Sequence, residues 1–179
     1  MKTEDIFILD FDGTICDLEV DWKSLKQEVR DLFSENYAVE NISFSSLLEN
    51  ICSDQNNRKI VLDLLEKYEQ PNGFAIVANY RESFIESLPF YYIISNNLHS
   101  TVQRALERLG CIDKCRGIIG FDTLFQAKPN SMAFDYLRTN DARIDLARVI
   151  YVGDMETDEV FANRNNVQFK YIHQIIEGK

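Results

Sequence analysis

Residues 5–14 read DIFILDFDGT, and this stretch decides the fold prediction. Its apolar run, Ile6–Leu9, is typical of a buried strand, and the carboxylates Asp10 and Asp12 follow directly. Side chains two apart on a strand face the same way, so we expect both carboxylates at one site, with the turn after the strand completing the geometry. Two carboxylates this close repel each other unless a cation or a shared proton intervenes. A hard divalent ion such as Mg2+ is the simplest resolution.

The length and composition indicate one globular domain, or one core with a modest insertion. The chain has 179 residues, 45% of them apolar, which is enough to bury a sizeable core. No apolar run approaches the roughly 20 residues that span a membrane, and residues 1–5 lack the features of a signal peptide. We therefore expect a cytoplasmic protein without a membrane partner. The sequence does not indicate an oligomeric state.

The charge and the side-chain inventory exclude further classes of function. A net charge of -10 argues against a nucleic-acid partner, because such binding rests on Lys and Arg. The four cysteines are scattered and form no Cys-x-x-Cys pair, so we expect free thiols and no zinc site. Two histidines, His99 and His173, leave little material for a Ser-His-Asp triad. Chemistry at this site would have to depend on carboxylates.

Residues 17–73 have the apolar periodicity of helices. Apolar side chains recur at helical spacing from Asp21, from Ser43 and from Arg58, which predicts three consecutive helices and no strand. Ser43 is expected to cap the second helix. The breaker sequence QPNG at residues 70–73 then ends this helical segment.

Helices and strands alternate over residues 74–179. The pattern predicts strands at 90–94, 117–120, 149–152 and 167–172, and helices at 75–88, 98–109, 132–137 and 158–163. This alternation is typical of an α/β fold with a doubly wound parallel sheet and helices on both faces. The strand at residues 6–9 joins that sheet across the helical insertion.

The polar residues that follow these strands define a candidate site. In doubly wound sheets, ligands bind beyond the carboxyl ends of the strands. The residues expected at those ends, or in a loop that faces them, are Asp10, Asp12, Ser95, Lys128 and Asp154. Their convergence predicts one site at this edge of the sheet.

Four short motifs, in order along the chain, resemble the signatures of one family. Residues 10–14 read DFDGT, Ser95 ends a strand, Lys128 precedes Pro129, and residues 153–158 read GDMETD. These are similar to the signatures of the haloacid dehalogenase-like superfamily, which begin with Asp-x-Asp-x-Thr and end with Gly-Asp-x-x-x-Asp. Most members of this superfamily are phosphatases. The resemblance covers essentially the whole chain.

The resemblance implies a division of the chain and a reaction. Residues 1–16 and 74–179 would form a Rossmann-like core, and residues 17–73 a small α-helical cap that closes over the site. Asp12 favours phosphate esters, because dehalogenase members lack this second carboxylate: their halide leaving group needs no proton. The implied enzyme is a Mg2+-dependent phosphatase that acts on a small phosphorylated metabolite.

The resemblance also implies roles for the acidic residues. Asp10 would be the nucleophile and form an aspartyl-phosphate. Asp12 would act as general acid and then as general base. Mg2+ would be held by Asp10, by the backbone carbonyl of Asp12 and by Asp154. Asp158 would orient Lys128 or a metal-bound water.

The remaining implied roles concern the phosphate. Ser95 and the backbone N–H of Asn96 would donate hydrogen bonds to a phosphate oxygen. Lys128 would offset negative charge on the phosphoryl group and on Asp10. Thr14 would fasten the loop.

Other interpretations stay open. Ser95 could cap a helix, Lys128 could be a solvated loop lysine, and Asp158 could be an ordinary first-turn acid favoured by the helix dipole. The same holds for Glu159, which also competes with Asp158 for the second acidic role. The alternative functions are a phosphomutase of the same fold, a phospho-receiver signalling domain and a non-catalytic binding protein.

Overall fold

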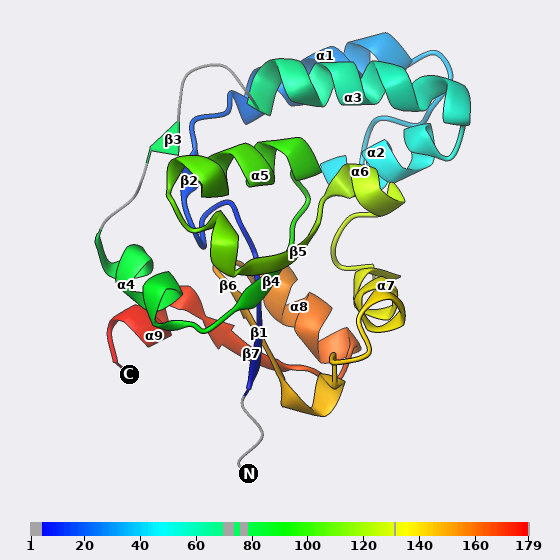
Figure 1. Cartoon of the computed structure of the whole chain (residues 1–179). Helices are drawn as coiled ribbons and strands as arrows, with labels where there is room; N and C mark the ends of the chain where they lie inside the picture. The colour runs from blue at the N-terminus through cyan, green and yellow to red at the C-terminus, as the bar shows by residue number, and fades with distance from the viewer. Residues whose placement is uncertain (1–4, 70–73, 76–78, 131, 179) are drawn as a thin grey trace.

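The computed structural model describes residues 5–69, 74–75, 79–130 and 132–178 (Figure 1). Within this described part, five strands form one sheet in the order β5-β4-β1-β6-β7, and every neighbouring pair is parallel. The strands are β1 (Ile6–Leu9), β4 (Tyr91–Ile94), β5 (Cys115–Ile119), β6 (Val149–Gly153) and β7 (Gln168–Tyr171). The strand predicted from DIFILDFDGT is therefore the central one.

Helices cover both faces of the sheet. The core helices are α4 (Asn79–Ser87), α5 (His99–Arg108), α6 (Phe121–Leu124), α7 (Met132–Asn140), α8 (Glu156–Arg164) and α9 (Ile172–Ile176). Successive strand residues turn to opposite faces, as the pleat requires. Ile8 belongs to the apolar cluster of α7 and α8, whereas Leu9 belongs to that of α4, α5 and α9. The fold class is α/β with a doubly wound parallel sheet, as predicted.

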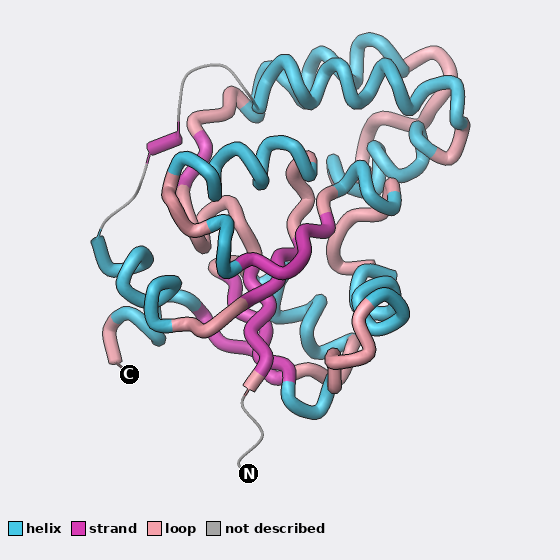
Figure 2. The backbone as a smooth tube through the Cα atoms, viewed as in Figure 1, coloured by secondary structure: helices cyan, strands magenta, loops and turns pink. Residues whose placement is uncertain are grey.

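Residues 17–69 contain three helices, which we call the insertion helices: α1 (Trp22–Phe33), α2 (Phe44–Cys52) and α3 (Gln55–Glu69). Their apolar faces pack into a cluster of their own, which three core residues extend: Leu98, Phe121 and Ala127. Ser43 caps α2 as predicted, because its Oγ accepts a hydrogen bond from Ser46 N at 3.1 Å. In Figure 2 the insertion helices lie beyond the carboxyl ends of the sheet strands.

A short pair of strands corrects the prediction for the two connections to the insertion helices. β2 (Asp17–Leu18) pairs antiparallel with β3 (Phe74–Ala75), whereas the sequence predicts no strand over residues 17–73 and a helix from residue 75. Two residues are too few for an alternating pattern to be recognised. Ala75 therefore belongs to a strand, and the helix predicted from residue 75 begins at Asn79. The QPNG sequence lies outside the described residues.

The end of the chain differs from the prediction in a second place. β7 ends at Tyr171, and Ile172 begins α9 instead of extending the strand. Ile172, Ile175 and Ile176 pack together with α4 and α5, which fixes this single turn as a helix. The prediction also omits α6. Both helices are so short that periodicity cannot separate them from a strand or a loop.

Candidate active site

Asp10 forms the floor of a pocket of about 370 Å3 at the carboxyl end of β1. The Asp10 N–H donates to Val152 O at 2.8 Å, so the parallel ladder with β6 holds its backbone. The residue is only 7% exposed. The sheet therefore fixes one carboxylate at the base of an otherwise open cavity.

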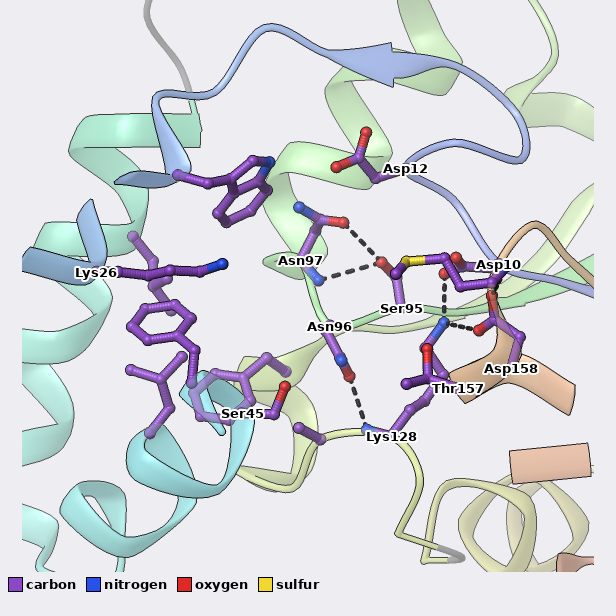
Figure 3. A pocket seen from close by; sticks show the side chains of 17 residues that line it. Asp10, Asp12, Lys26, Ser45, Ser95, Asn96, Asn97, Lys128, Thr157 and Asp158 are labelled. Carbon is purple, nitrogen blue, oxygen red and sulfur yellow. Dashed lines mark hydrogen bonds and ion pairs between the residues drawn. The ribbon is translucent and has the colours of Figure 1, made fainter. Parts of the chain in front are cut away.

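The turn after Asp10 changes the direction of the second carboxylate. Both Asp10 and Asp12 line the pocket, as expected from their positions. They do not face the same way, however: the Asp12 carboxylate points away from Asp10 and accepts a hydrogen bond from Leu18 N at 2.8 Å (Figure 3). The strand ends at Leu9, so the alternation of side chains no longer applies at these two positions.

Gly13 allows Asp154 to pack directly against the loop after β1. Gly13 has a φ of 83°, and a Cβ built there would lie 2.4 Å from Asp154 Oδ2. Both the backbone conformation and the close approach therefore require glycine. On the other side, Thr14 Oγ1 donates to Asp154 Oδ1 at 3.3 Å. The loop thus holds the Asp154 carboxylate beside Asp10.

Lys128 links the acidic residues of the site. Its Nζ lies 2.6 Å from Asp10 Oδ1 and 2.6 Å from Asp158 Oδ1. A third hydrogen bond of 3.1 Å runs to the hydroxyl of Tyr151. An ammonium group has three donors, so these acceptors satisfy Lys128 completely. The side chain is buried, unlike that of a solvated loop lysine.

Burial and charge determine the protonation of this group. Burial raises the pKa of Asp10, and the positive charge of Lys128 partly offsets the rise. Burial lowers the pKa of Lys128, but the Asp10 and Asp158 carboxylates outweigh burial, and its net shift is upward. Burial raises the pKa of Tyr151 well above its usual value, so Tyr151 stays neutral. Lys128 therefore remains a cation at neutral pH.

Three carboxylates in this site offer oxygen ligands to a metal ion. Asp10, Asp154 and Asp158 each present an oxygen, and these oxygens lie within 4.8 Å of one another. Burial, followed by the charge of Asp158, raises the pKa of Asp154. With one cation among three carboxylates, of which Asp10 and Asp158 are buried and Asp154 is half-buried, the site holds more acidic than basic groups. Hard oxygen donors in this arrangement fit a divalent ion such as Mg2+.

Asp158 is the least available of these three ligands. Its Oδ1 accepts from Lys128, and its Oδ2 accepts from Met155 N at 3.2 Å. Both oxygens are thus engaged within the protein, an arrangement suited to orienting Lys128. Glu159, the competing acid in the sequence, accepts instead from the hydroxyl of Tyr171 at 2.8 Å.

The loop after β4 presents polar groups to the same pocket. Ser95 Oγ donates to Asn97 Oδ1 at 2.9 Å and accepts from Asn97 N at 3.1 Å. Asn96 Oδ1 accepts from Lys128 N at 2.7 Å, which ties this loop to the Lys128 loop. Ser95 does not cap α5, whose N-cap residue is Leu98.

The structure brings the eight residues singled out from the sequence to one end of the sheet. Six of them line the pocket: Asp10, Asp12, Ser95, Asn96, Lys128 and Asp158. The other two, Thr14 and Asp154, bond to each other beside Asp10. All eight residues therefore lie together at one site.

Two residues that organise this site were not predicted from the sequence. Tyr151 accepts from Lys128 and donates to Ile94 O at 3.2 Å. Asn97 holds the Ser95 hydroxyl. The Tyr151 hydroxyl within the apolar run 149–152 could have indicated a hydrogen bond in the site, because a buried polar group needs a partner. Asn97 carried no signal beyond its proximity to Ser95.

Two acids of the insertion helices hold the core loops of the site. Glu49 Oε1 accepts from Ala127 N at 2.7 Å, directly before Lys128. Glu69 Oε2 accepts from Leu98 N at 3.0 Å, at the start of α5. The insertion helices therefore bond to both loops that carry the predicted phosphate-binding residues.

Glu69 makes stability depend on pH. Glu69 is 4% exposed, and burial raises its pKa from 4.5 to about 7, against the hydrogen bond from Leu98. A raised carboxyl pKa leaves stability unaffected below about pH 4.5 and lowers it as the pH rises toward 7. We expect the free energy of unfolding of Glu69→Gln, relative to that of the wild type, to increase by about 3 kcal/mol when the pH is raised from 4.5 to 8. Urea unfolding at both pH values measures this difference.

Exposed Glu35 provides the control for this measurement. Glu35→Gln should track the wild type at both pH values, because the carboxyl of Glu35 stays in water. Other buried acids, such as Asp10, contribute equally to each protein and cancel in the comparison. A Glu69→Gln advantage that is the same at pH 4.5 and pH 8 would contradict a buried, titrating Glu69.

Comparison with known proteins places the chain in one family. The sequence profile of the family described as haloacid dehalogenase-like hydrolase matches residues 7–172. That range includes every residue of the site described above. No curated protein sequence matches the chain.

Solved structures share the fold at low sequence identity. A protein from Bacteroides fragilis, assigned as a haloacid dehalogenase-like hydrolase, is 16% identical over 93% of this chain and 86% of its own, with a TM-score of 0.66. A protein from Lactobacillus plantarum, assigned as a phosphoglycolate phosphatase, is 15% identical over 95% and 86%, with a TM-score of 0.65. A dehalogenase is 16% identical over 94% and 84%, with a TM-score of 0.59. The shared fold therefore spans two kinds of reaction.

Proposed function

The chain belongs to the haloacid dehalogenase-like hydrolase family, and we propose that within it the protein is a Mg2+-dependent phosphatase of a small organic phosphate monoester. The pair of carboxylates at one pocket carries this proposal. In this proposal Asp10 attacks phosphorus, and Asp12, which lines the same pocket from the turn after β1, exchanges protons. A dehalogenase has no use for Asp12, because a halide leaves without a proton. An ester oxygen needs one, which favours the phosphatase.

In the proposed first step, Asp10 attacks phosphorus and the P–O bond to the leaving group breaks. Asp12 gives its proton to the leaving oxygen, and an aspartyl-phosphate remains on Asp10. Lys128 binds Oδ1 of Asp10, which leaves Oδ2 for attack. Ser95 exchanges its hydrogen bond to Asn97 for one to a phosphate oxygen, with help from the N–H of Asn96.

In the proposed second step, Asp12 takes a proton from a water molecule, which attacks the phosphorus of the aspartyl-phosphate. The bond between phosphorus and Asp10 breaks, and inorganic phosphate leaves. Asp158 and Tyr151 keep Lys128 against Asp10 throughout, so the buried carboxylate has a cationic partner in both steps.

The proposed Mg2+ ligands are the carboxylates of Asp10 and Asp154 and the backbone carbonyl of Asp12. The oxygen donor set and the close packing of Asp154 on Gly13 support this choice. A bound divalent ion offsets the repulsion between a carboxylate and a phosphate dianion. Asp158 remains a positioning residue, because both of its oxygens are already bonded.

Removal of divalent metal is expected to stop the reaction. Treatment with EDTA should abolish phosphate release from p-nitrophenyl phosphate, and added Mg2+ should restore it. Mg2+ alone should also raise the melting temperature, because an ion that binds only the folded state stabilises it. Calorimetry of Asp154→Asn, with Asp135→Asn as the exposed control, tests the site directly. Equal Mg2+-induced shifts in both variants would exclude Asp154 as a ligand.

Further features of the chain remain proposals. The insertion helices would act as a cap over the site, and residues 1–16 and 74–179 would form the core domain. The partner would be a small phosphorylated metabolite, with no role for nucleic acid. Among the described residues, no helix has the length and apolar character needed to cross a membrane. The cytoplasmic location stays a prediction from the sequence.

A further inference from the structure

The pocket above Asp10 is larger than a phosphoryl group needs. Its volume of about 370 Å3 is roughly twelve times the share of one molecule in liquid water. In the proposed reaction the phosphoryl group occupies only the floor, beside Asp10 and Ser95. The remaining space extends to the insertion helices and must receive the organic part of the substrate.

The insertion helices supply a wall that differs in character from the floor. We call this surface the insertion wall, and it consists of Trp22 and Lys26 from α1, Phe44 and Leu48 from α2, and Leu65 from α3. Ser45 is the one further residue of these helices that lines the pocket. The wall thus offers two aromatic faces, two aliphatic side chains and a single cation.

Lys26 extends from this wall toward the pocket (Figure 3). Its Nζ lies 5.8 Å from the centre of the Phe44 ring, and the side chain is half-buried. Among the residues that the structure describes, no carboxylate forms an ion pair with Lys26, although the chain holds 29 acids against 19 basic residues. The other charged groups of the pocket are Asp10, Asp12, Lys128 and Asp158, all on the core side. A cation that faces the cavity from the wall is suited to an anionic ligand group.

The wall is poorly suited to a sugar. A ring of hydroxyl groups needs acceptors as well as donors, and buried polar groups without partners weaken binding. The polar groups of the wall side chains are the Lys26 ammonium and the Trp22 indole N–H, which are donors only, and the neighbouring Ser45 adds one hydroxyl that can accept. Its aromatic faces instead favour a ring or hydrocarbon segment.

We propose that the leaving group of the substrate is an apolar ring or hydrocarbon segment that packs on Trp22 and Phe44 and ends in an anionic group paired with Lys26. This inference rests on the proposed phosphatase activity and names its substrate class. The phosphate end binds at Asp10, and the second anion lies at the opposite side of the same pocket. Lys26 and Trp22 are then specificity-determining residues and take no part in the bond changes.

Two aryl esters that differ by one carboxylate test the role of Lys26. Phosphate release is measured from phenyl phosphate and from 4-carboxyphenyl phosphate with Mg2+, for the wild type, Lys26→Met and Lys23→Met. Methionine keeps the apolar stem and removes the charge, and exposed Lys23 is the matched control on the same helix. We expect Lys26→Met to lower kcat/KM for the carboxylated ester about tenfold more than for phenyl phosphate. Lys23→Met should change neither value. The different reactivities of the two esters cancel, because each variant is compared with the wild type on the same ester.

A second variant tests the aromatic face. Trp22→Ala should lower kcat/KM for each aryl ester about tenfold more than it lowers kcat/KM for glycerol 3-phosphate. Glycerol 3-phosphate has no ring that could pack on Trp22. An equal effect of Lys26→Met on both aryl esters, or an equal effect of Trp22→Ala on all three esters, would overturn the assignment of the wall. Phosphatase activity would survive that result.

A failure of the proposed phosphatase function is distinguished from a failure of the proposed substrate class. If the wild type releases phosphate from no ester, the phosphatase proposal fails, and binding then decides the fate of the wall. Trp22 is the single tryptophan of the chain, so its fluorescence reports ligands at this surface. We expect 4-carboxyphenyl phosphate to change the fluorescence of Asp10→Asn protein, and Lys26→Met in that background to raise Kd about tenfold. Equal Kd values with and without Lys26 would reject the proposal.

Discussion

Asp10→Asn is expected to lower kcat for phosphate-ester hydrolysis on the order of 10,000-fold or more. An amide is a poor nucleophile, so the aspartyl-phosphate cannot form even though the rest of the pocket is intact. The amide oxygen still accepts a hydrogen bond from Lys128, whose Nζ lies 2.6 Å from Asp10 Oδ1. We therefore expect the fold to survive, as judged by circular dichroism and melting temperature.

Asp135→Asn is the control for this experiment, because Asp135 is an exposed acid on α7 that forms an exposed ion pair with Arg138. It should retain wild-type turnover. The measurement is release of inorganic phosphate, with product analysis of any sugar ester. Turnover of Asp10→Asn near that of Asp135→Asn would remove Asp10 as the nucleophile. An isomerised sugar phosphate in place of free phosphate would indicate a phosphomutase.

Lys128→Met should have the largest effect on stability. The variant leaves the carboxylates of Asp10 and Asp158 buried without their common cation, since both pair with Lys128 Nζ at 2.6 Å. Removing one partner of a buried ion pair destabilises a protein by about 3–5 kcal/mol. We expect a loss of that size in urea unfolding at pH 7, in EDTA, together with loss of turnover.

The pH dependence of this loss has a definite sign. Without Lys128, burial and the negative charge of Asp158 raise the pKa of Asp10 further, so the folded state takes up a proton more readily than the unfolded state. The loss of stability in Lys128→Met should therefore become smaller as the pH falls toward about 4, the usual pKa of an unfolded aspartate. Lys59→Met removes an exposed ion pair with Asp63 and should change stability little at any pH. A Lys128→Met variant as stable as Lys59→Met would show that the buried pair is not needed.

Much of the fold could be predicted because its longer helices show their period and its central strands are continuous apolar runs. The strand at Ile6–Leu9 agrees residue for residue with its prediction, and α1 begins within one residue of the expected start. The segments for which the prediction was wrong are all short. β2, β3 and α9 contain two to five residues, and these segments take their form from what they pair with or pack against. Local sequence carries too little information at that length.

The identity of the site residues could be predicted for a related reason. In a parallel sheet, the carboxyl ends of all strands lie at one edge, so residues after separate strands converge whatever the details of the loops. The convergence of Asp10, Ser95 and Asp154 followed from that rule alone. Their partners did not follow from it: Tyr151 and Asn97 act through hydroxyl and amide groups whose distance from Lys128 and Ser95 depends on the packed structure.

The sequence by itself determined the strands of the main sheet, the longer helices, their order and the edge of the sheet where chemistry is possible, because periodicity and apolar runs are local properties. Only the tertiary structure decided that Asp12 points away from Asp10, and that the insertion helices, through Glu49 and Glu69, bond to the loops of the site. These outcomes depend on turns and on contacts between segments far apart in the chain. The free energy that selects them comes from burial and hydrogen bonding of groups that meet only after the chain has folded.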